Sequence, residues 1–297
     1  SQSTKDIGER LDGLVMQGGR QKTGNLRSGG VRRGKRPVVG LILATRFDKG
    51  YLNSFVPVGL GYIAASLRKE LPDVRVVMAE TIDSLMAMGP DIVGISSQTE
   101  NYAVAIDYAR AIKDDLGIPV VVGGVHVSML PESLDEVFDV AVIGEGETTF
   151  VELIRSFIDN EGIRYDRLKQ IQGLAYRRNG TVERTEPRGL IKDLDTLPRP
   201  VLEELPFHVA SHMGCIVSSR GCPYHCSFCI SEKFAQRYRC LSAEIVVNEI
   251  EMLARGRGVS HIVFYDDLLI ANKKRLRELI SGLRERRLLG KLSYSCA

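Results

Sequence analysis

Apolar runs alternate with amphipathic stretches over the first half of the chain. The runs are almost continuously hydrophobic, as expected of strands buried on both faces of a sheet. They span residues 38–44, 74–79, 91–97, 118–124 and 140–146. Between and after them, apolar residues recur at helical spacing over residues 58–71, 102–117 and 147–160. This alternation predicts an α/β fold with a doubly wound parallel sheet of Rossmann or flavodoxin type, covered by helices on both faces.

The pattern changes after residue 165. Residues 171–186 predict a β-hairpin around Asn179-Gly180, and three prolines within residues 193–207 predict an extended linker. A second alternation follows, with strands expected at 215–219, 261–265 and 292–296 and helices at 242–255 and 272–287. We therefore expect a tail (1–36), a doubly wound domain (37–165), a hairpin with a linker (166–212) and a second β/α domain (213–297).

Residues that follow the strands are candidates for a binding site, because ligands of such sheets bind beyond the carboxyl ends of the strands. Glycines there let a ligand approach the backbone, and polar side chains offer contacts. The candidates are Ser96, Gln98 and Thr99 after the third strand, Gly123, Gly124 and His126 after the fourth, and Gly144, Glu145 and Gly146 after the fifth. Simpler roles stay open: tight turns for the glycines, a structural hydrogen bond for His126 and capping of the next helix for Glu145. No GxGxxG follows the first strand, which argues against a dinucleotide.

Charge is unevenly distributed along a chain whose formal net charge is only +3. Residues 1–36 carry nine Lys or Arg against three Asp or Glu, and we interpret them as a flexible, solvated tail. Nucleic-acid binding is not favoured, because no aromatic side chains for base stacking accompany the basic residues. No apolar run approaches the roughly 18 residues of a membrane span. The N-terminus also lacks an apolar signal-peptide core, so a cytoplasmic location is expected.

Three of the six cysteines lie close together in SSRGCPYHCSFCI, residues 218–230. Cys222, Cys226 and Cys229 are spaced C-x3-C-x2-C, which in a cytoplasmic chain indicates metal ligands or free thiols rather than disulfides. A structural zinc site normally has four ligands, and no second ligand pair follows, although His225 is an extra donor. Iron–sulfur clusters are held by thiolates, typically one per iron. Three cysteines on a four-iron cluster would leave one iron open to a substrate or cofactor.

The other cysteines, Cys215, Cys240 and Cys296, lie outside this motif. We interpret each of them as an ordinary small apolar residue.

The cysteine motif, with the aromatic Phe228 before its last cysteine, resembles the signature of radical S-adenosylmethionine (SAM) enzymes. Stretches upstream are similar to the cobalamin-binding domain that precedes the radical SAM domain in one large subfamily. They are PVGLGYIAASLR, PDIVGISSQTENYAVAIDYARAIK, IPVVVGGVH, FDVAVIGEGETTFVELI and DLDTLPRP. FYDDLLIAN (264–272) is similar to that subfamily's second barrel strand. The resemblance covers residues 37–297 and implies that residues 213–297 form the first part of a radical SAM (β/α) barrel.

The resemblance also implies a set of cofactors. The three cysteines would bind a [4Fe-4S] cluster, SAM would chelate the open iron, and a flavodoxin- or ferredoxin-type protein would supply one electron. SAM would then be cleaved to a 5′-deoxyadenosyl radical. Phe228, Asp266 and Asp267 are expected near SAM, a solvated turn being the alternative for the two aspartates, and Arg220 could offset the charge of the cluster. The nine strand-end candidates would contact cobalamin.

The chain departs from the family pattern in two ways. After the first strand, ATRFDKGYLNSF contains Asp48 but no D-x-H-x-x-G motif, so we expect base-off cobalamin without a histidine ligand. The second β/α domain contains about two and a half β/α units, whereas the radical SAM barrel has six. We therefore expect the isolated chain to be inactive, or to rely on self-association or a partner chain that completes the barrel.

The leading functional hypothesis is methyl transfer through methylcobalamin to an unactivated carbon or phosphorus centre of a small-molecule or natural-product substrate. A cobalamin-dependent rearrangement or oxidative cyclisation without methyl transfer is the second. A non-catalytic cobalamin- or metal-binding sensor module is the third. The sequence does not identify the substrate.

Overall fold

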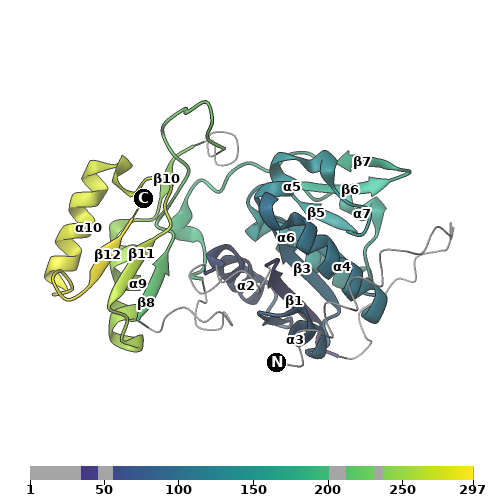
Figure 1. The fold of residues 1–297 in the computed structure, drawn as a ribbon, viewed down its shortest axis with the longest axis horizontal. Helices are drawn as coiled ribbons and strands as arrows, with labels where there is room; N and C mark the ends of the chain where they lie inside the picture. The colour runs from purple at the N-terminus through teal and green to yellow at the C-terminus, as the bar shows by residue number, and fades with distance from the viewer. Residues whose placement is uncertain (1–34, 46–55, 201–211, 231–236, 297) are drawn as a thin grey trace, which may run out of the picture.

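The computed structural model describes residues 35–45, 56–200, 212–230 and 237–296. The basic segment up to residue 34 and Asp48 lie outside the described residues. The first domain is built on a seven-stranded sheet of order β2-β1-β3-β4-β5-β6-β7 (Figure 1). Its strands are β1 (Val38–Leu43), β2 (Arg75–Met78), β3 (Ile92–Ser96), β4 (Val120–Gly123), β5 (Val140–Val142), β6 (Leu174–Arg178) and β7 (Thr181–Arg184).

The first five strands are parallel and have the order 2-1-3-4-5, which is the flavodoxin-like order. This arrangement confirms the predicted doubly wound fold. The β6–β7 hairpin turns at Asn179 and Gly180, both of which have positive φ. It pairs antiparallel with β5, with Ala141 opposite Ala175. The hairpin that the pattern assigns to the connector therefore extends the sheet of the first domain.

Helices cover both faces of this sheet, as Figure 1 shows. They are α2 (Val58–Glu70), α3 (Ile82–Ala87), α4 (Tyr102–Leu116), α5 (Val125–Met129), α6 (Gly146–Asp159) and α7 (Tyr165–Leu168), with 3-10 turns η3 (Thr99–Asn101) and η4 (Pro131–Ser133). Leucine and isoleucine side chains of α2 and α6 bury one face of the sheet, and small and branched side chains of α4 bury the other. Helix α4 ends at Gly117, which takes the left-handed conformation (φ 63°) that a helix C-terminus favours.

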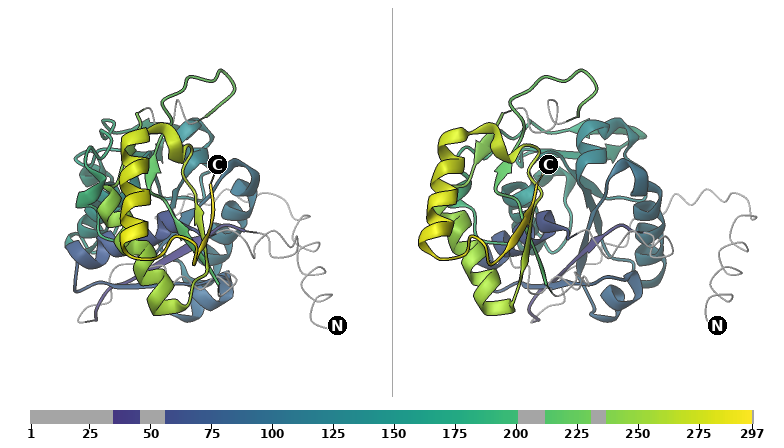
Figure 2. Two further views of the ribbon diagram at one scale, coloured as in Figure 1. Left: turned by 90° about the vertical axis from the view of Figure 1, so that its left-hand side faces the viewer. Right: turned by 60° about the vertical axis from the view of Figure 1, so that its left-hand side comes forward.

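The second domain is a three-stranded parallel sheet of order β12-β11-β8. Its elements are β8 (Met213–Ile216), α9 (Ala243–Arg257), β11 (His261–Phe264), η7 (Leu269–Ala271), α10 (Lys273–Glu285) and β12 (Ser293–Ser295), preceded by η5 (Leu194–Thr196). Helices α9 and α10 lie on the side of this sheet away from the first domain (Figures 1 and 2). Two and a half β/α units are thus present, as the sequence predicts.

The inner face of the second sheet packs against the first domain. Cys215 of β8 is buried in the same core cluster as α2 and α6, with Val263 and Tyr265 packed against it. Burial raises the pKa of the Cys215 thiol, which donates to Tyr265 Oη at 3.4 Å. The interpretation of Cys215 as a small apolar residue agrees with this position. Cys240 is half-buried and Cys296 is exposed.

A short antiparallel pair joins residues on the two sides of the cysteine motif. It consists of β9 (Ser219–Arg220) and β10 (Arg239–Cys240). Residues 221–230, which we call the cysteine loop, follow β9 and contain all three motif cysteines. The loop projects from the body of the molecule as the green trace above the two domains in Figures 1 and 2.

Candidate functional site

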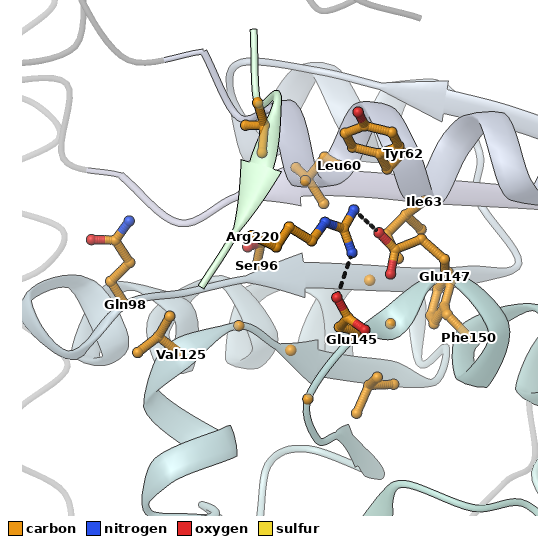
Figure 3. A pocket seen from close by; sticks show the side chains of 18 of the residues that line it. Leu60, Tyr62, Ile63, Ser96, Gln98, Val125, Glu145, Glu147, Phe150 and Arg220 are labelled. Atoms are coloured by element: carbon orange, nitrogen blue, oxygen red, sulfur yellow. Dashed lines mark hydrogen bonds and ion pairs between the residues drawn. The ribbon is translucent and has the colours of Figure 1, made fainter. Parts of the chain in front are cut away.

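A cavity of about 520 Å³ lies between the two domains, at the carboxyl edge of the first sheet. Its volume is within the usual range of small-molecule and cofactor sites. Its walls come from the loops after β3, β4 and β5, from α2, from β9 and β10, and from the end of β11. Figure 3 shows this cavity, with Arg220 entering from the second domain and Glu145 and Glu147 from the first.

Seven of the nine strand-end candidates line the cavity. They are Ser96, Gln98, Gly123, Gly124, Gly144, Glu145 and Gly146. Because parallel strands bring their carboxyl ends to one edge, residues from three separate loops meet here, as predicted. The other two candidates, Thr99 and His126, are not among the cavity-lining residues.

His126 and Thr99 stabilise the protein beside the cavity. His126 is 8% exposed, its Nδ1 lies 3.2 Å from Thr99 Oγ1, and its Nε2 lies 2.9 Å from Ser133 Oγ. The imidazole stacks on Tyr102, with ring centroids 3.9 Å apart. Burial lowers the pKa of His126, which favours the neutral ring. Both ring nitrogens therefore have partners within the protein, so the simpler structural role describes this residue.

The glycines of the site differ in what their missing side chains allow. A Cβ on Gly144 would meet nothing within 4 Å, so this backbone (φ 81°) is open toward the cavity. A Cβ on Gly124 would instead lie 2.3 Å from the carbonyl oxygen of Ser97, and one on Gly146 2.9 Å from Ile63 Cδ1. Gly124 is thus required for packing of the protein itself, whereas a side chain at Gly146 would only need the end of Ile63 to shift. Gly144, like Gly59 of α2, has the open approach that a ligand needs.

Charged side chains from both domains form an ion-pair network in the cavity wall. Arg220 Nη1 donates to Glu145 Oε1 at 2.8 Å, and Arg220 Nη2 donates to Glu147 Oε1 at 2.5 Å (Figure 3). Arg239 Nη1 donates to both carboxylate oxygens of Glu145 at 2.9 Å. Glu145 Oε2 also accepts from the backbone N–H of Ile191 at 2.7 Å. Glu145 stands at the N-cap position of α6, but its side chain makes no capping hydrogen bond. Arg220 is paired with carboxylates of the first domain.

Burial and pairing act against each other in this network. Burial alone would raise the pKa of Glu145, but its hydrogen bond and charge interaction with Arg220, with further contributions from Ile191 and Arg239, hold the pKa below its usual range. The pKa of Arg220 is raised because Glu147 and Glu145 outweigh its burial. Glu145 and Arg220 are therefore both charged at neutral pH. The guanidinium of Arg220 also lies 5.0 Å from the ring centre of Tyr62, a cation–π contact.

The cysteine loop reaches the cavity at its two ends. Cys222 and Cys229 are half-buried, Cys226 is exposed, and all three are free thiols. Their neighbours Gly221 and Ile230 line the cavity wall. Among the described residues, no three Cys, His, Asp or Glu side chains are close enough together to hold a metal ion. The three thiols have the donor chemistry of an iron–sulfur site, but they would have to come closer together to hold one cluster.

The three residues expected near SAM lie in different environments. Asp267 is exposed and lines the cavity. Asp266 is 2% exposed and accepts hydrogen bonds at 2.6 Å from Ser218 N, Ser218 Oγ and Ser219 Oγ. Its carboxylate fixes the backbone before the cysteine loop and does not line the cavity. Phe228 is 91% exposed and is not among the lining residues.

Sequence reasoning missed several lining residues. Arg239 and Tyr62 are the most important, because they complete the ion network and the contact with Arg220. An arginine soon after the cysteine motif could have marked Arg239 as a candidate site residue. Its partner Glu145 could not have been identified in this way, because it lies 94 residues away in the sequence. Tyr62 lies in the helical pattern of α2, where an aromatic side chain is normally interpreted as part of the hydrophobic core.

The cavity also fits the chemistry of a large planar cofactor. It is lined mainly by apolar side chains, with the open backbone at Gly144 and the polar groups of Ser96 and Gln98 at its edge. Among the residues that the structure describes, no histidine lines the cavity.

Comparison with known proteins gives the same picture. The family model for the B12 binding domain matches residues 51–154. An uncharacterized methyltransferase of Pyrococcus horikoshii is 35% identical over 246 residues, which cover 77% of this chain and 52% of the relative. The anaerobic magnesium-protoporphyrin IX monomethyl ester cyclase of Cereibacter sphaeroides is 28% identical over 260 residues, covering 81% of this chain and 42% of the relative.

A solved structure shares the fold. The radical S-adenosylmethionine methyltransferase TsrM from Kitasatospora setae, determined with tryptophan and a SAM analogue, superposes with a TM-score of 0.68 at 20% identity. The match covers 86% of this chain and 54% of that one. A second structure of TsrM, with cobalamin and a [4Fe-4S] cluster bound, matches with a TM-score of 0.65.

These matches place the chain in the family of radical SAM proteins that carry a B12-binding domain. The chain spans about half the length of the curated relatives it matches. Within the described residues, no helix has the length and apolar character needed to cross a lipid bilayer.

Proposed function

We propose that this chain forms the cobalamin-binding and cluster-binding part of a radical SAM enzyme that transfers a methyl group to a small-molecule substrate. The observation that carries the proposal is the position of the cavity. It lies between the carboxyl edge of a flavodoxin-like sheet and the base of a loop with three free cysteines. One ligand in this cavity would therefore contact both domains.

Different residues of the chain would hold the two cofactors. Ser96, Gln98 and the open backbone at Gly144 would hold cobalamin, and Cys222, Cys226 and Cys229 would hold the [4Fe-4S] cluster. When bound, these groups supply methyl-carrying and one-electron chemistry that side chains lack. The protein positions them and excludes water through the apolar cavity wall, which includes Leu60, Ile63 and Phe150. Asp267, at the rim, would contact a polar group of SAM.

A second function has support of its own. Cyclisation is the reaction named for the Cereibacter relative, which matches 81% of this chain, and it favours our second hypothesis of an oxidative cyclisation without methyl transfer. The chain described here contains the elements common to both kinds of relative. The choice between the two reactions depends on the substrate, whose binding residues we do not assign.

The test uses protein reconstituted anaerobically with iron, sulfide and hydroxocobalamin. Bound iron, sulfide and cobalt are measured first, and SAM cleavage to 5′-deoxyadenosine is then followed after reduction with dithionite. We expect both cofactors to bind. SAM carrying a labelled methyl group then separates the two reactions, because the label reaches the product only in methyl transfer.

The outcomes decide between the hypotheses. Cobalt bound without iron, or zinc bound in place of iron, would overturn the proposal and favour a sensor module. Cofactor binding without SAM cleavage would show that the reaction needs further protein. The same assay on a chain extended to the length of the relatives would then test the activity.

A further inference from the structure

Two arginines face each other at the base of the cysteine loop. Arg220 ends β9, Arg239 begins β10, and the two are direct register partners in the antiparallel pair. Like charges directly opposite each other on neighbouring strands are destabilising. This pair therefore needs a carboxylate beside it. Within the described residues, the ion pairs of both guanidinium groups are with carboxylates of the first domain.

Glu145 of the first domain supplies that carboxylate to both arginines. It accepts from Arg220 Nη1 at 2.8 Å and from Arg239 Nη1 at 2.9 Å. The side chains are only 12%, 16% and 8% exposed for Glu145, Arg220 and Arg239, so water screens these contacts weakly. Glu147 pairs with Arg220 as well, whereas Glu145 is the acidic partner of Arg239 in the described part of the chain.

Arg239 depends on this contact more than Arg220 does. Its Nη2 is buried and has no hydrogen-bond partner among the described residues. Its other nitrogens donate to Glu145 and to the carbonyls of Ile191 and Arg237, and Glu145 is the charged partner among them. Removing one partner of a buried ion pair leaves an uncompensated charge and is strongly destabilising. Loss of the Glu145 charge should therefore release β10, and with it the base of the cysteine loop.

We propose that Glu145 is a positioning residue: it fixes both ends of the β9–β10 pair to the carboxyl edge of the first sheet, and so fixes the cysteine loop relative to the cavity. Glu145 lies between Gly144 and Gly146, both of which line the cavity. One short segment thus touches the cobalamin side of the cavity through its backbone and the cluster side through its carboxylate. The role of Glu145 in holding the cluster-binding loop rests on the proposed function. Its effect on the β9–β10 pair can be tested without cofactors.

The experiment compares backbone amide hydrogen exchange in the wild-type chain and in Glu145→Gln, which keeps the size and removes the charge. We expect amides of residues 212–222 and 237–242 to exchange at least about tenfold faster in the variant. Amides of β1, β3 and β4 should keep their protection. Glu147→Gln, which leaves both arginines paired with Glu145, should have a smaller effect.

Glu152→Gln is the matched control. Glu152 forms a partly buried ion pair with Arg188 outside the β9–β10 pair, so its loss tests the general cost of removing such a charge. Unchanged exchange at residues 212–222 and 237–242 in Glu145→Gln would overturn the proposal. Faster exchange spread evenly over both domains would also overturn it, because Glu145 would then only stabilise the fold.

Iron release tests whether Glu145 also affects cluster binding by the cysteine loop. In protein reconstituted with iron and sulfide, release of iron to a chelator should be at least about threefold faster in Glu145→Gln than in the wild type and in Glu152→Gln. Equal release would overturn the link between Glu145 and the loop. If the wild type binds no iron, the proposed function fails while the exchange experiment still decides the structural claim.

Discussion

The carbonyl oxygen of Ser97 occupies the space where Gly124 would carry a side chain. A Cβ built on Gly124 would lie 2.3 Å from that oxygen, and the residue has φ 103° and ψ −173°. This backbone region is essentially restricted to glycine. The loops after β3 and β4 therefore pack backbone against backbone at the edge of the cavity, and Gly124 makes their contact possible.

Gly124→Ala should destabilise the protein by about 3 kcal/mol or more, because a steric clash with backbone adds to an unfavourable dihedral angle. Urea unfolding followed by circular dichroism measures the change. Gly117→Ala is the control, since Gly117 has a positive φ (63°) but nothing within 4 Å of its Cβ position. It should cost only about 1 kcal/mol. Equal losses for the two variants would show that the contact with Ser97 has no energetic role.

His126 should make the first domain less stable at mildly acidic pH. Burial lowers its pKa in the folded protein, so the unfolded chain binds a proton more readily. The contribution of the neutral ring is fully present above pH about 6.5, the pKa of an unperturbed histidine, and is lost as the pH falls toward the lower folded-state value. Unfolding free energies measured between pH 8 and pH 5 should show this decline.

His126→Gln tests the assignment. The variant keeps a polar side chain near Thr99 and Ser133 but has no group that titrates in this range. Its stability should be lower at pH 8 and should fall less steeply toward pH 5. A slope equal to that of the wild type would assign the pH dependence to other groups.

Much of the fold could be predicted because its signals are local. Strands β1, β3 and β4 are short apolar runs, and Gly117 marks the end of α4. The β6–β7 hairpin was also visible at Asn179-Gly180, but its place in the sheet was not. That place depends on the pairing of Ala175 with Ala141, a contact between distant segments that a turn signal does not specify.

In the candidate site, too, local features could be predicted and contacts between distant residues could not. Ser96 and Gly144 could be placed at one edge because parallel strands end there, and both line the cavity. The role of His126 depends on Ser133, and the role of Glu145 depends on Arg239 in the other domain. Such partners are set by tertiary packing, which residue types and spacing do not reveal.

Asp266→Asn should destabilise the second domain by about 2 kcal/mol. The buried carboxylate accepts three hydrogen bonds, and an amide would replace one acceptor oxygen with a donor facing Ser218 or Ser219. Asp267→Asn is the control: its exposed side chain should leave the unfolding free energy within about 0.5 kcal/mol of the wild type. A stable Asp266→Asn protein would mean that the carboxylate charge is not needed to hold the backbone before the cysteine loop.

Cys226→Ala should abolish binding of the iron–sulfur cluster. The chain has three thiols in the cysteine loop, and removing one leaves two for a cluster that normally takes about one thiolate per iron. Iron and sulfide content after anaerobic reconstitution, with the visible absorption of the cluster, measures the effect. Cys240→Ala is the matched control, because Cys240 is a half-buried free thiol outside the loop and its loss should leave the iron content unchanged. If Cys226→Ala bound as much iron as the wild type, the thiols of the loop would not be the ligands.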